Sequence, residues 1–258
     1  MLEKIVESCQ FLLNNYPDAQ ASKSYLDSRL EQSSQETFGF GYFPGAYNIS
    51  VLTDLVGEEM LAKEKLLYAR EIEDSLFPRK VQYCYFEEYP LVMPFRDIYG
   101  RVAGLVGRTL LGEEDRKKRK IAKYKNTSES SIFKKGHLLF GLYENKQAIL
   151  DVGCVYIVEG QFDVIKAVEK GFRNIVALGS SSMTSYQFSV ISRYTNNIFL
   201  LLDNDEAGHI GRKRIISKFG KHANIRNFYL PDEYKDIDEY ITKDEIGGYT
   251  EMSFVVKD

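Results

Sequence analysis

The feature that most constrains this chain is the alternation of short apolar segments with helical ones over residues 154–241. The four apolar segments are CVYIVEG (154–160), RNIVALGSSS (173–182), NIFLLLDND (197–205) and NIRNFYLP (224–231). Continuous apolar strands separated by helices of about ten to fifteen residues are typical of a parallel sheet covered on both faces. We therefore predict an α/β domain with helices on both faces of a parallel β-sheet.

The segments between these strands have helical periodicity. In FDVIKAVEKG (162–171), Val164, Ile165 and Val168 share one helical face, and Gly171 ends the pattern. Thr184 and Gln187 form a capping-box signature that opens a second helix through Arg193. Two more helices are expected, in EAGHIGRKRIISKFG (206–220) and in the short segment KDIDEYI (235–241).

The first half of the chain has a less regular pattern. Residues 1–30 and 53–74 have helical character, FGFGYFPG (38–45) is a glycine-aromatic turn, and residues 89–110 suggest a β-hairpin. The change of pattern falls near residues 145–153. We therefore expect an α+β domain over residues 1–150 and the parallel-sheet domain over residues 151–258.

Composition excludes several protein classes. The chain has 258 residues with 44% hydrophobic and 28% charged side chains, as in ordinary globular proteins. Charged residues interrupt the N-terminus, and no apolar run approaches the roughly 20 residues that cross a bilayer, so we expect a cytoplasmic protein without a membrane span. The three cysteines form no CxxC pair and the three histidines do not cluster, which argues against zinc. Any metal should be a hard cation held by oxygen.

Charge is distributed unevenly along the chain. Residues 1–88 carry 8 basic and 15 acidic side chains, whereas residues 89–136 carry 12 basic and 5 acidic ones. A concentrated basic segment suits a polyphosphate or a nucleic-acid backbone. The alternative for residues 116–120 alone is a solvated lysine-rich loop.

Acidic side chains follow two of the predicted parallel strands and recur at the end of the domain. They are Glu159, Asp163, Asp203, Asp205, Asp236 and Asp238. Each has a structural alternative as a strand end, a turn former or a helix cap. Taken together, converging carboxylates repel one another unless a divalent cation neutralises them. Mg²⁺ (or Mn²⁺) suits such oxygen ligands, and two ions can clamp the attacking and leaving oxygens of a phosphoryl transfer.

Several blocks of this sequence resemble a known family. EGQFDVIKA, ALGSSS, LLLDNDEAG and KDIDEYI, in this order, resemble the Toprim domain of primases, topoisomerases and some nucleases. The forms EGxxD, ALG[ST] and DxDxAG resemble the DnaG-type DNA primases of bacteria and phages in particular. Upstream, YLDSRL, FGFGYFPG, PFRDIYGRVAGLVGRTL and KYKNTSESSIFKKGHLLFGLYE resemble the N-terminal half of the primase catalytic core, so the resemblance spans about residues 20–242.

The resemblance implies roles for individual residues. Glu159 is implied as the catalytic acid/base, and Asp163 as a support of the site. Glu159, Asp203 and Asp205 are implied as catalytic, and these three with Asp236 and Asp238 as metal ligands. The implied nucleotide- and DNA-binding residues are Arg29, Arg96, Arg108, Lys123, Asn126 and Lys135. For Arg96, a salt bridge to its neighbour Asp97 is the alternative.

The sequence also departs from the family pattern. Family primases carry a zinc-binding ribbon and a helicase-binding domain, and this sequence has no cysteine set for the ribbon and stops soon after KDIDEYI. It is therefore either an excised core or a compact primase that works with a helicase or a separate zinc-ribbon protein. Asn204 replaces the glycine that usually separates the two aspartates; asparagine tolerates the left-handed backbone that such a turn can require.

The expected function is template-dependent synthesis of short RNA primers on single-stranded DNA from ribonucleoside triphosphates, with Mg²⁺. Two other classes stay open from the sequence. One is a Toprim nuclease, whose metal chemistry is nearly the same; a topoisomerase would need a further DNA-gate domain. The other is a non-catalytic DNA-binding module of a replication complex.

Overall fold

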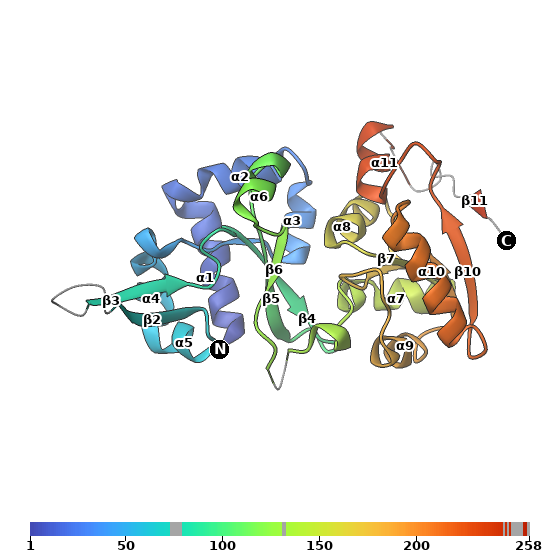
Figure 1. Ribbon diagram of the computed structural model, residues 1–258, viewed down its shortest axis with the longest axis horizontal. Coiled ribbons are helices and arrows are strands. Elements are labelled where there is room, and N and C mark those ends of the chain that lie inside the picture. Colours follow the sequence, from blue (N-terminus) through green and yellow to red (C-terminus); the bar gives the residue numbers. More distant parts are fainter. Residues whose placement is uncertain (73–78, 131–132, 245, 247, 249–254, 257–258) are drawn as a thin grey trace. The chain divides into compact units, whose positions relative to one another are not determined.

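The computed structural model describes residues 1–258 except 73–78, 131–132, 245, 247, 249–254 and 257–258 (Figure 1). The chain divides into two compact units, one of residues 1–95 with 101–133 and the other of residues 96–100 with 134–258. We call them the N-terminal unit and the C-terminal unit. The domain boundary that we expect at residues 150/151 lies further along the chain than this division and stays a prediction.

A mostly parallel sheet forms the centre of the C-terminal unit. Its strands are β7 (Val155–Val158), β8 (Ile175–Ala177), β9 (Asn197–Leu200), β10 (Asn224–Tyr229) and β11 (Val255–Val256). The order is β11-β10-β9-β7-β8; β8, β7, β9 and β10 run parallel, and β11 pairs antiparallel with β10. The predicted parallel sheet is confirmed, and β11 is an addition that the sequence did not indicate.

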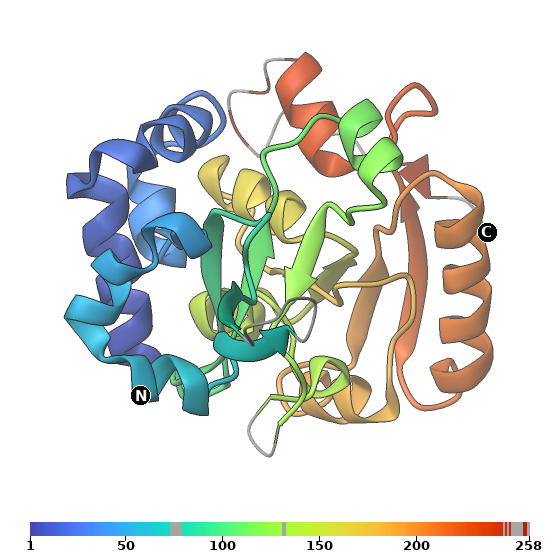
Figure 2. The same cartoon turned by 60° about the vertical axis from the view of Figure 1, so that its left-hand side comes forward.

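Helices follow each parallel strand, as the periodicity predicts. They are α8 (Gln161–Glu169), α9 (Ser185–Ile191), α10 (Glu206–Phe219) and α11 (Ile237–Lys243), with η3 (Lys135–His137) and α7 (Leu142–Val152) before β7. The connection from β7 to β8 runs in the opposite direction along the sheet to the two connections that follow it. Because such connections are right-handed, α8 lies on one face and α9 and α10 on the other (Figure 2).

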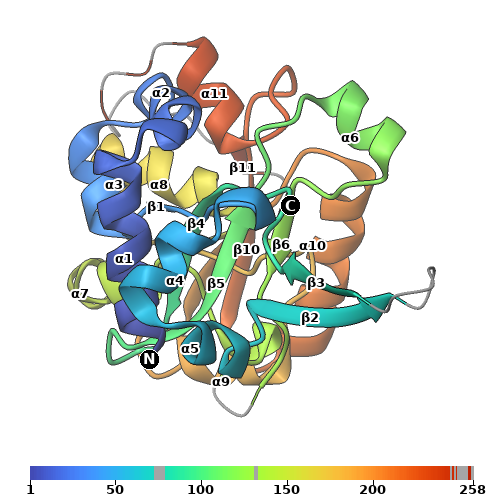
Figure 3. The ribbon, with the colours of Figure 1, turned by 90° about the vertical axis from the view of Figure 1, so that its left-hand side faces the viewer.

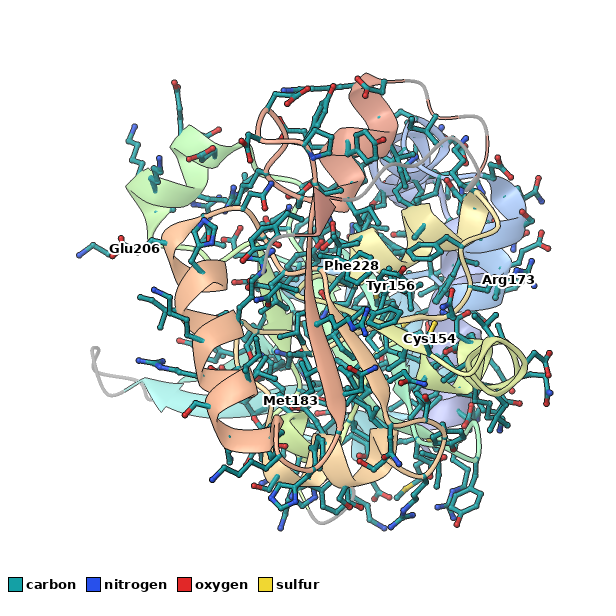
Figure 4. All side chains as sticks on the ribbon, turned by 90° about the vertical axis from the view of Figure 1, so that its right-hand side faces the viewer. Cys154, Tyr156, Arg173, Met183, Glu206 and Phe228 are labelled. Carbon is teal, nitrogen blue, oxygen red and sulfur yellow. The ribbon has the colours of Figure 1, made fainter. Side chains whose placement is uncertain are left out.

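The two faces of the sheet are packed differently. On one face, buried side chains of the strands, such as Ile157 and Leu200, form a continuous core with Ile149 of α7, Val190 of α9 and Ile215 of α10. On the other face, the Tyr156 ring centroid lies 5.1 Å from that of Phe199 and 5.4 Å from that of Phe228. Figure 4 labels Tyr156 and Phe228 on this face. Burial on both faces explains why these strands are apolar at successive positions.

Local chemistry fixes where the helices begin. Thr184 accepts a hydrogen bond from the Gln187 backbone N–H at 3.0 Å, and the Thr184 N–H donates to the Gln187 side chain at 3.0 Å, so the predicted capping box is present. The helix after it ends at Ile191 rather than Arg193. At the start of α10, a Cβ on Gly208 would lie 2.1 Å from the Asp203 carbonyl oxygen. Only glycine therefore lets α10 begin so close to the preceding turn.

The N-terminal unit is α+β, as expected. Its helices are α1 (Leu2–Asn15), η1 (Pro17–Ala19), α2 (Gln20–Asp27), α3 (Gln32–Phe38), η2 (Ala46–Asn48), α4 (Ser50–Val56), α5 (Glu58–Lys63) and α6 (Glu113–Arg119). Its strands are β1 (Gly41–Tyr42), β2 (Leu67–Ile72), β3 (Arg79–Cys84), β4 (Leu91–Arg96), β5 (Val102–Arg108) and β6 (Tyr124–Asn126). One sheet has the order β1-β4-β5-β6, and β2 and β3 form a separate hairpin (Figure 3). The predicted hairpin at 89–110 is confirmed as β4 and β5, with Gly100 in the left-handed region at φ 89°.

The helix predicted over residues 53–74 is wrong at residues 67–72, and residues 73 and 74 lie outside the described residues. α5 ends at Lys63, and Lys65 has a left-handed φ of 58°, which breaks the helix. Residues 67–72 then form β2, which pairs antiparallel with β3 over six residue pairs. Antiparallel pairing with the next strand, β3, therefore overrides the helical propensity of residues 67–72.

Long apolar helices are absent from the part of the chain that the structure describes. None of the helices defined there is both long enough and apolar enough to span a bilayer.

Candidate active site

The carboxyl ends of β7 and β9 meet at the point where the strand order reverses, which is where open α/β sheets bind ligands. Glu159 follows β7, and Asp203 lies three residues after the end of β9. The Asp203 backbone N–H points at Glu159 Oε1, with an N–O distance of 3.4 Å. The structure thus brings together two predicted site residues that are 44 positions apart.

A hydrogen bond between Asp163 and Asp238 brings a third segment, KDID, to this edge of the sheet. Asp163 is buried in the first turn of α8, where its Oδ2 accepts a hydrogen bond from the Gly160 N–H at 3.0 Å. Its other oxygen, Oδ1, accepts one from the Asp238 N–H at 3.2 Å. Asp163 thus links the EGQFD segment to KDID, and its supporting role in the site stays a prediction.

Asp205 and Asp236 both act as helix caps. Asp205 Oδ1 accepts from the Gly208 N–H at 3.0 Å at the start of α10, and Asp236 Oδ1 accepts from the Glu239 N–H at 2.8 Å at the start of α11. The helix cap weighed as the structural alternative for Asp205 is therefore correct for one of its oxygens, and the cap formed by Asp236 is a further finding. The other oxygen of Asp205, Oδ2, faces a cation, as described below.

Burial and mutual repulsion shift the acid–base properties of this edge. Burial, followed by the negative charge of Asp203, raises the pKa of Glu159 from its ordinary value near 4.5 to about 7. Burial and the charge of Asp236 raise the pKa of Asp203 from near 3.8 to about 6. Burial also raises the pKa of Asp163. Pairs of carboxyl groups with raised pKa values are a recognised mark of functional sites.

Two basic side chains that the sequence did not single out lie beside these carboxyl groups. The Lys235 Nζ lies 3.6 Å from Asp203 Oδ2 and 3.6 Å from Asp205 Oδ2. The buried Arg212 guanidinium donates to the carbonyl oxygens of Asp203, at 2.9 Å, and of Leu202. Arg212 therefore holds the backbone of the turn, while Lys235 faces its carboxylates.

Asn204 has a role different from the one that its sequence position suggests. Its backbone is not among the left-handed non-glycine residues of the described chain, which are Lys65 and Lys120. Its side-chain amide donates to the Tyr234 carbonyl oxygen at 2.9 Å and lies 3.3 Å from that of Leu230. Asn204 thus ties the turn with the first two aspartates to the loop that carries Lys235 and Asp236.

The donor set fits a hard divalent cation. Within the residues that the structure describes, no three Asp, Glu, His or Cys side chains are grouped closely enough to enclose one ion. However, Asp203 and Asp205 already face one cation, the Lys235 ammonium, and every candidate ligand is an oxygen. Two carboxylates completed by water and phosphate oxygens match the preference of Mg²⁺.

Two of the predicted nucleotide- and DNA-binding residues lie in the C-terminal unit. A Cβ on Gly179 would lie 3.1 Å from Lys135 Cε, and the Gly179 N–H donates to the Glu159 carbonyl oxygen at 3.0 Å. Lys135 therefore lies at the acidic edge of the sheet. Arg96 lies 3.8 Å from Glu144 at the start of α7 and donates to the Gly100 carbonyl oxygen at 2.9 Å.

Three others surround aromatic rings of the N-terminal unit. Arg108 is buried on β5; its guanidinium donates to the hydroxyls of Tyr25 and Tyr124 and lies 5.1 Å from each ring centroid. Lys123 Nζ lies 5.6 Å from the Tyr124 centroid. Asn126 ends β6, and its backbone carbonyl accepts from the Tyr85 hydroxyl at 2.7 Å. Arg29, the remaining predicted residue, follows α2 and is partly buried.

Weak signals for the missed residues were present in the sequence. Arg212 falls on the buried stripe of α10 with Gly208, Gly211, Ile215 and Phe219, and an arginine on an apolar stripe indicates a special partner. Lys235 immediately precedes Asp236. Nothing in the sequence shows that it reaches back to Asp203 and Asp205, because that contact depends on how the loop after β10 folds.

Comparison with known families assigns both halves of the chain. Residues 10–146 match the model of the DNA primase catalytic core, N-terminal domain, and residues 156–241 match a Toprim-like model. Among similar sequences, the DNA primase of Aquifex aeolicus is 32% identical over 238 residues, which are 90% of this chain and 44% of that protein. The chain thus spans less than half the length of this relative.

Solved structures agree with this assignment. The crystal structure of the Aquifex aeolicus primase with its zinc-binding and RNA polymerase domains has a TM-score of 0.76 and 29% identity; the match covers 98% of this chain and 60% of that one. A DnaG primase catalytic domain bound to single-stranded DNA has a TM-score of 0.73 and 26% identity, covering 94% of this chain and 75% of that one.

Proposed function

The chain belongs to the DNA primase catalytic-core family, and we propose that it synthesises short RNA primers on a single-stranded DNA template. One observation carries the proposal. Glu159, Asp203 and Asp205, the residues that the family motifs imply as catalytic, lie at one edge of the sheet at its topological switch point. A relative of similar fold binds single-stranded DNA, which supports the same template class here.

The chemistry proposed for the site is nucleotidyl transfer from ribonucleoside triphosphates. Asp203 and Asp205, with Asp236 and Asp238, would hold Mg²⁺ or Mn²⁺, which when bound supplies the charge that stabilises the phosphates in the transition state. Glu159 suits the role of a proton acceptor near the primer 3′-hydroxyl, because burial raises its pKa to about 7.

The basic residues are assigned to phosphate contacts. Lys135 lies at the acidic edge, where the triphosphate of an incoming nucleotide would sit. Arg29, Arg96, Arg108, Lys123 and Asn126 are proposed to contact nucleotide or template, mainly through phosphates and without reading sequence. A helicase or a separate zinc-ribbon protein as a partner is part of the same proposal.

Incorporation of labelled ribonucleotides on single-stranded DNA with Mg²⁺ tests this function. We expect wild-type activity to fall at least about a hundredfold in Asp205→Asn and in Asp203→Asn, which keep the side-chain shape but lose the charge. Glu233→Gln, an exposed change in the same unit, is the control. Cleavage of DNA without ribonucleotides would favour a nuclease instead, and equal activity in wild type and both aspartate variants would refute the metal assignment.

A further inference from the structure

We propose that Lys235 is an internal counter-ion of the candidate metal site, whose ammonium holds Asp203 and Asp205 together until a divalent cation displaces it. The inference rests on the proposed function only in requiring that a divalent cation binds these two carboxylates. The proposed function names residues that bind the metal. This inference adds Lys235, which competes with the metal for the carboxylates of Asp203 and Asp205.

The first support is the position of the ammonium. Lys235 Nζ is equidistant, at 3.6 Å, from one oxygen of Asp203 and one oxygen of Asp205. Asp203 Oδ2 and Asp205 Oδ2 are the oxygens that a shared cation would use, since Asp205 Oδ1 is occupied as the cap of α10. The ammonium therefore stands where a divalent ion would balance both charges.

The second support is that backbone hydrogen bonds fix the loop that carries Lys235. The position of its ammonium near Asp203 and Asp205 therefore follows from the path of the backbone as well as from the side chain. The Asn204 N–H donates to the Lys235 carbonyl oxygen at 2.8 Å. The Lys235 N–H donates to Glu239 Oε2 at 2.8 Å, which anchors the loop to α11. Lys235 is thus held by its backbone on both sides while its side chain, 57% exposed, can leave towards solvent.

The third support is the charge of the site. Glu159, Asp163, Asp236 and Asp238 add to the two aspartates, whereas Arg212 contacts the turn through backbone oxygens. Lys235 forms ion pairs with two carboxylates of this edge, those of Asp203 and Asp205. Neighbouring carboxylates repel one another, and the Lys235 ammonium offsets part of that repulsion in the absence of metal. A divalent cation offsets more of it, so exchange is favourable once metal is present.

Binding of Mn²⁺ alone, measured by electron paramagnetic resonance of the free ion, tests the inference on the full chain. We expect Lys235→Met to bind Mn²⁺ about threefold to tenfold more tightly than wild type, because the competing charge is gone. Lys235→Arg, which keeps the charge, should bind no tighter than wild type. Lys221→Met is the matched control: it removes an exposed lysine of the same unit, between α10 and β10, and it should change the affinity less than twofold.

Thermal unfolding provides a readout that does not require metal binding by wild type. Lys235→Met should unfold at a lower temperature than wild type in EDTA, and the difference should disappear with saturating Mn²⁺. If wild type binds Mn²⁺ and Lys235→Met binds it no more tightly, this inference is overturned and the proposed function stays intact. Absence of binding in all variants overturns both, whereas binding by Lys235→Met alone supports the inference.

Discussion

Removing the charge of Glu159 should stabilise the metal-free protein at alkaline pH. Burial and the neighbouring Asp203 raise the pKa of Glu159 from near 4.5 to about 7. The ionised carboxylate therefore destabilises the folded state, whereas water solvates it fully in the unfolded state. A full shift of this size corresponds to about 3 kcal/mol. Because the side chain is partly exposed and solvent screens it, we expect Glu159→Gln to gain about 1–2 kcal/mol at pH 8.

The pH dependence follows from the direction of the shift. A carboxyl group with a raised pKa in the folded state keeps its proton there after the unfolded chain has lost it. The stability of the metal-free wild type therefore falls as the pH rises from about 4.5 to about 7, and the gain in Glu159→Gln should be small at pH 5. The amide that replaces the carboxylate in Glu159→Gln would still offer an oxygen to the Asp203 N–H, so the exchange tests charge rather than shape.

Urea unfolding in EDTA at pH 5 and pH 8 measures this effect, with Glu233→Gln as the exposed control. Saturating Mg²⁺ should reverse the order at pH 8, because metal binding stabilises the wild type more than the variant. A gain in Glu159→Gln of the same size at both pH values, or no gain at pH 8, would refute the reasoning that burial and the charge of Asp203 make the ionised Glu159 destabilising.

Three other changes give expected outcomes. Asn204→Ala should lower the free energy of unfolding by about 1–2 kcal/mol and weaken Mn²⁺ binding, since it frees the loop after β10; urea unfolding and spin resonance measure both. Gly208→Ala should cost more than about 2 kcal/mol in thermal unfolding, because its Cβ would overlap the Asp203 carbonyl, whereas Gly112→Ala has open space and should cost less than about 1 kcal/mol. Arg108→Lys should weaken single-stranded DNA binding about threefold to tenfold in a fluorescence titration without altering its salt dependence strongly, because the charge remains while the fork geometry is lost.

The C-terminal unit shows how far the sequence alone can lead. Apolar runs with helical segments between them predict the parallel strands and helices, because burial on both faces demands that pattern whatever the rest of the chain does. The capping box at Thr184 is likewise a local matter, and it is confirmed. The N-terminal unit is less predictable: residues 67–72 read as a helix and form β2, since strand pairing with β3 outweighs local propensity.

The candidate site divides in the same way. That Glu159, Asp203 and Asp205 lie at strand ends can be read from the sequence, because the apolar runs stop at these residues. That β7 and β9 are neighbours, with β8 on the far side of β7, is decided by the tertiary structure, and it alone puts Glu159 against Asp203. Asn204 contacts Tyr234, and Lys235 contacts Asp203, across more than 25 positions of the sequence. Both contacts depend on how the loop after β10 folds. Local interactions thus fix the elements and their ends, whereas the order of the strands and the path of one loop decide which charges meet.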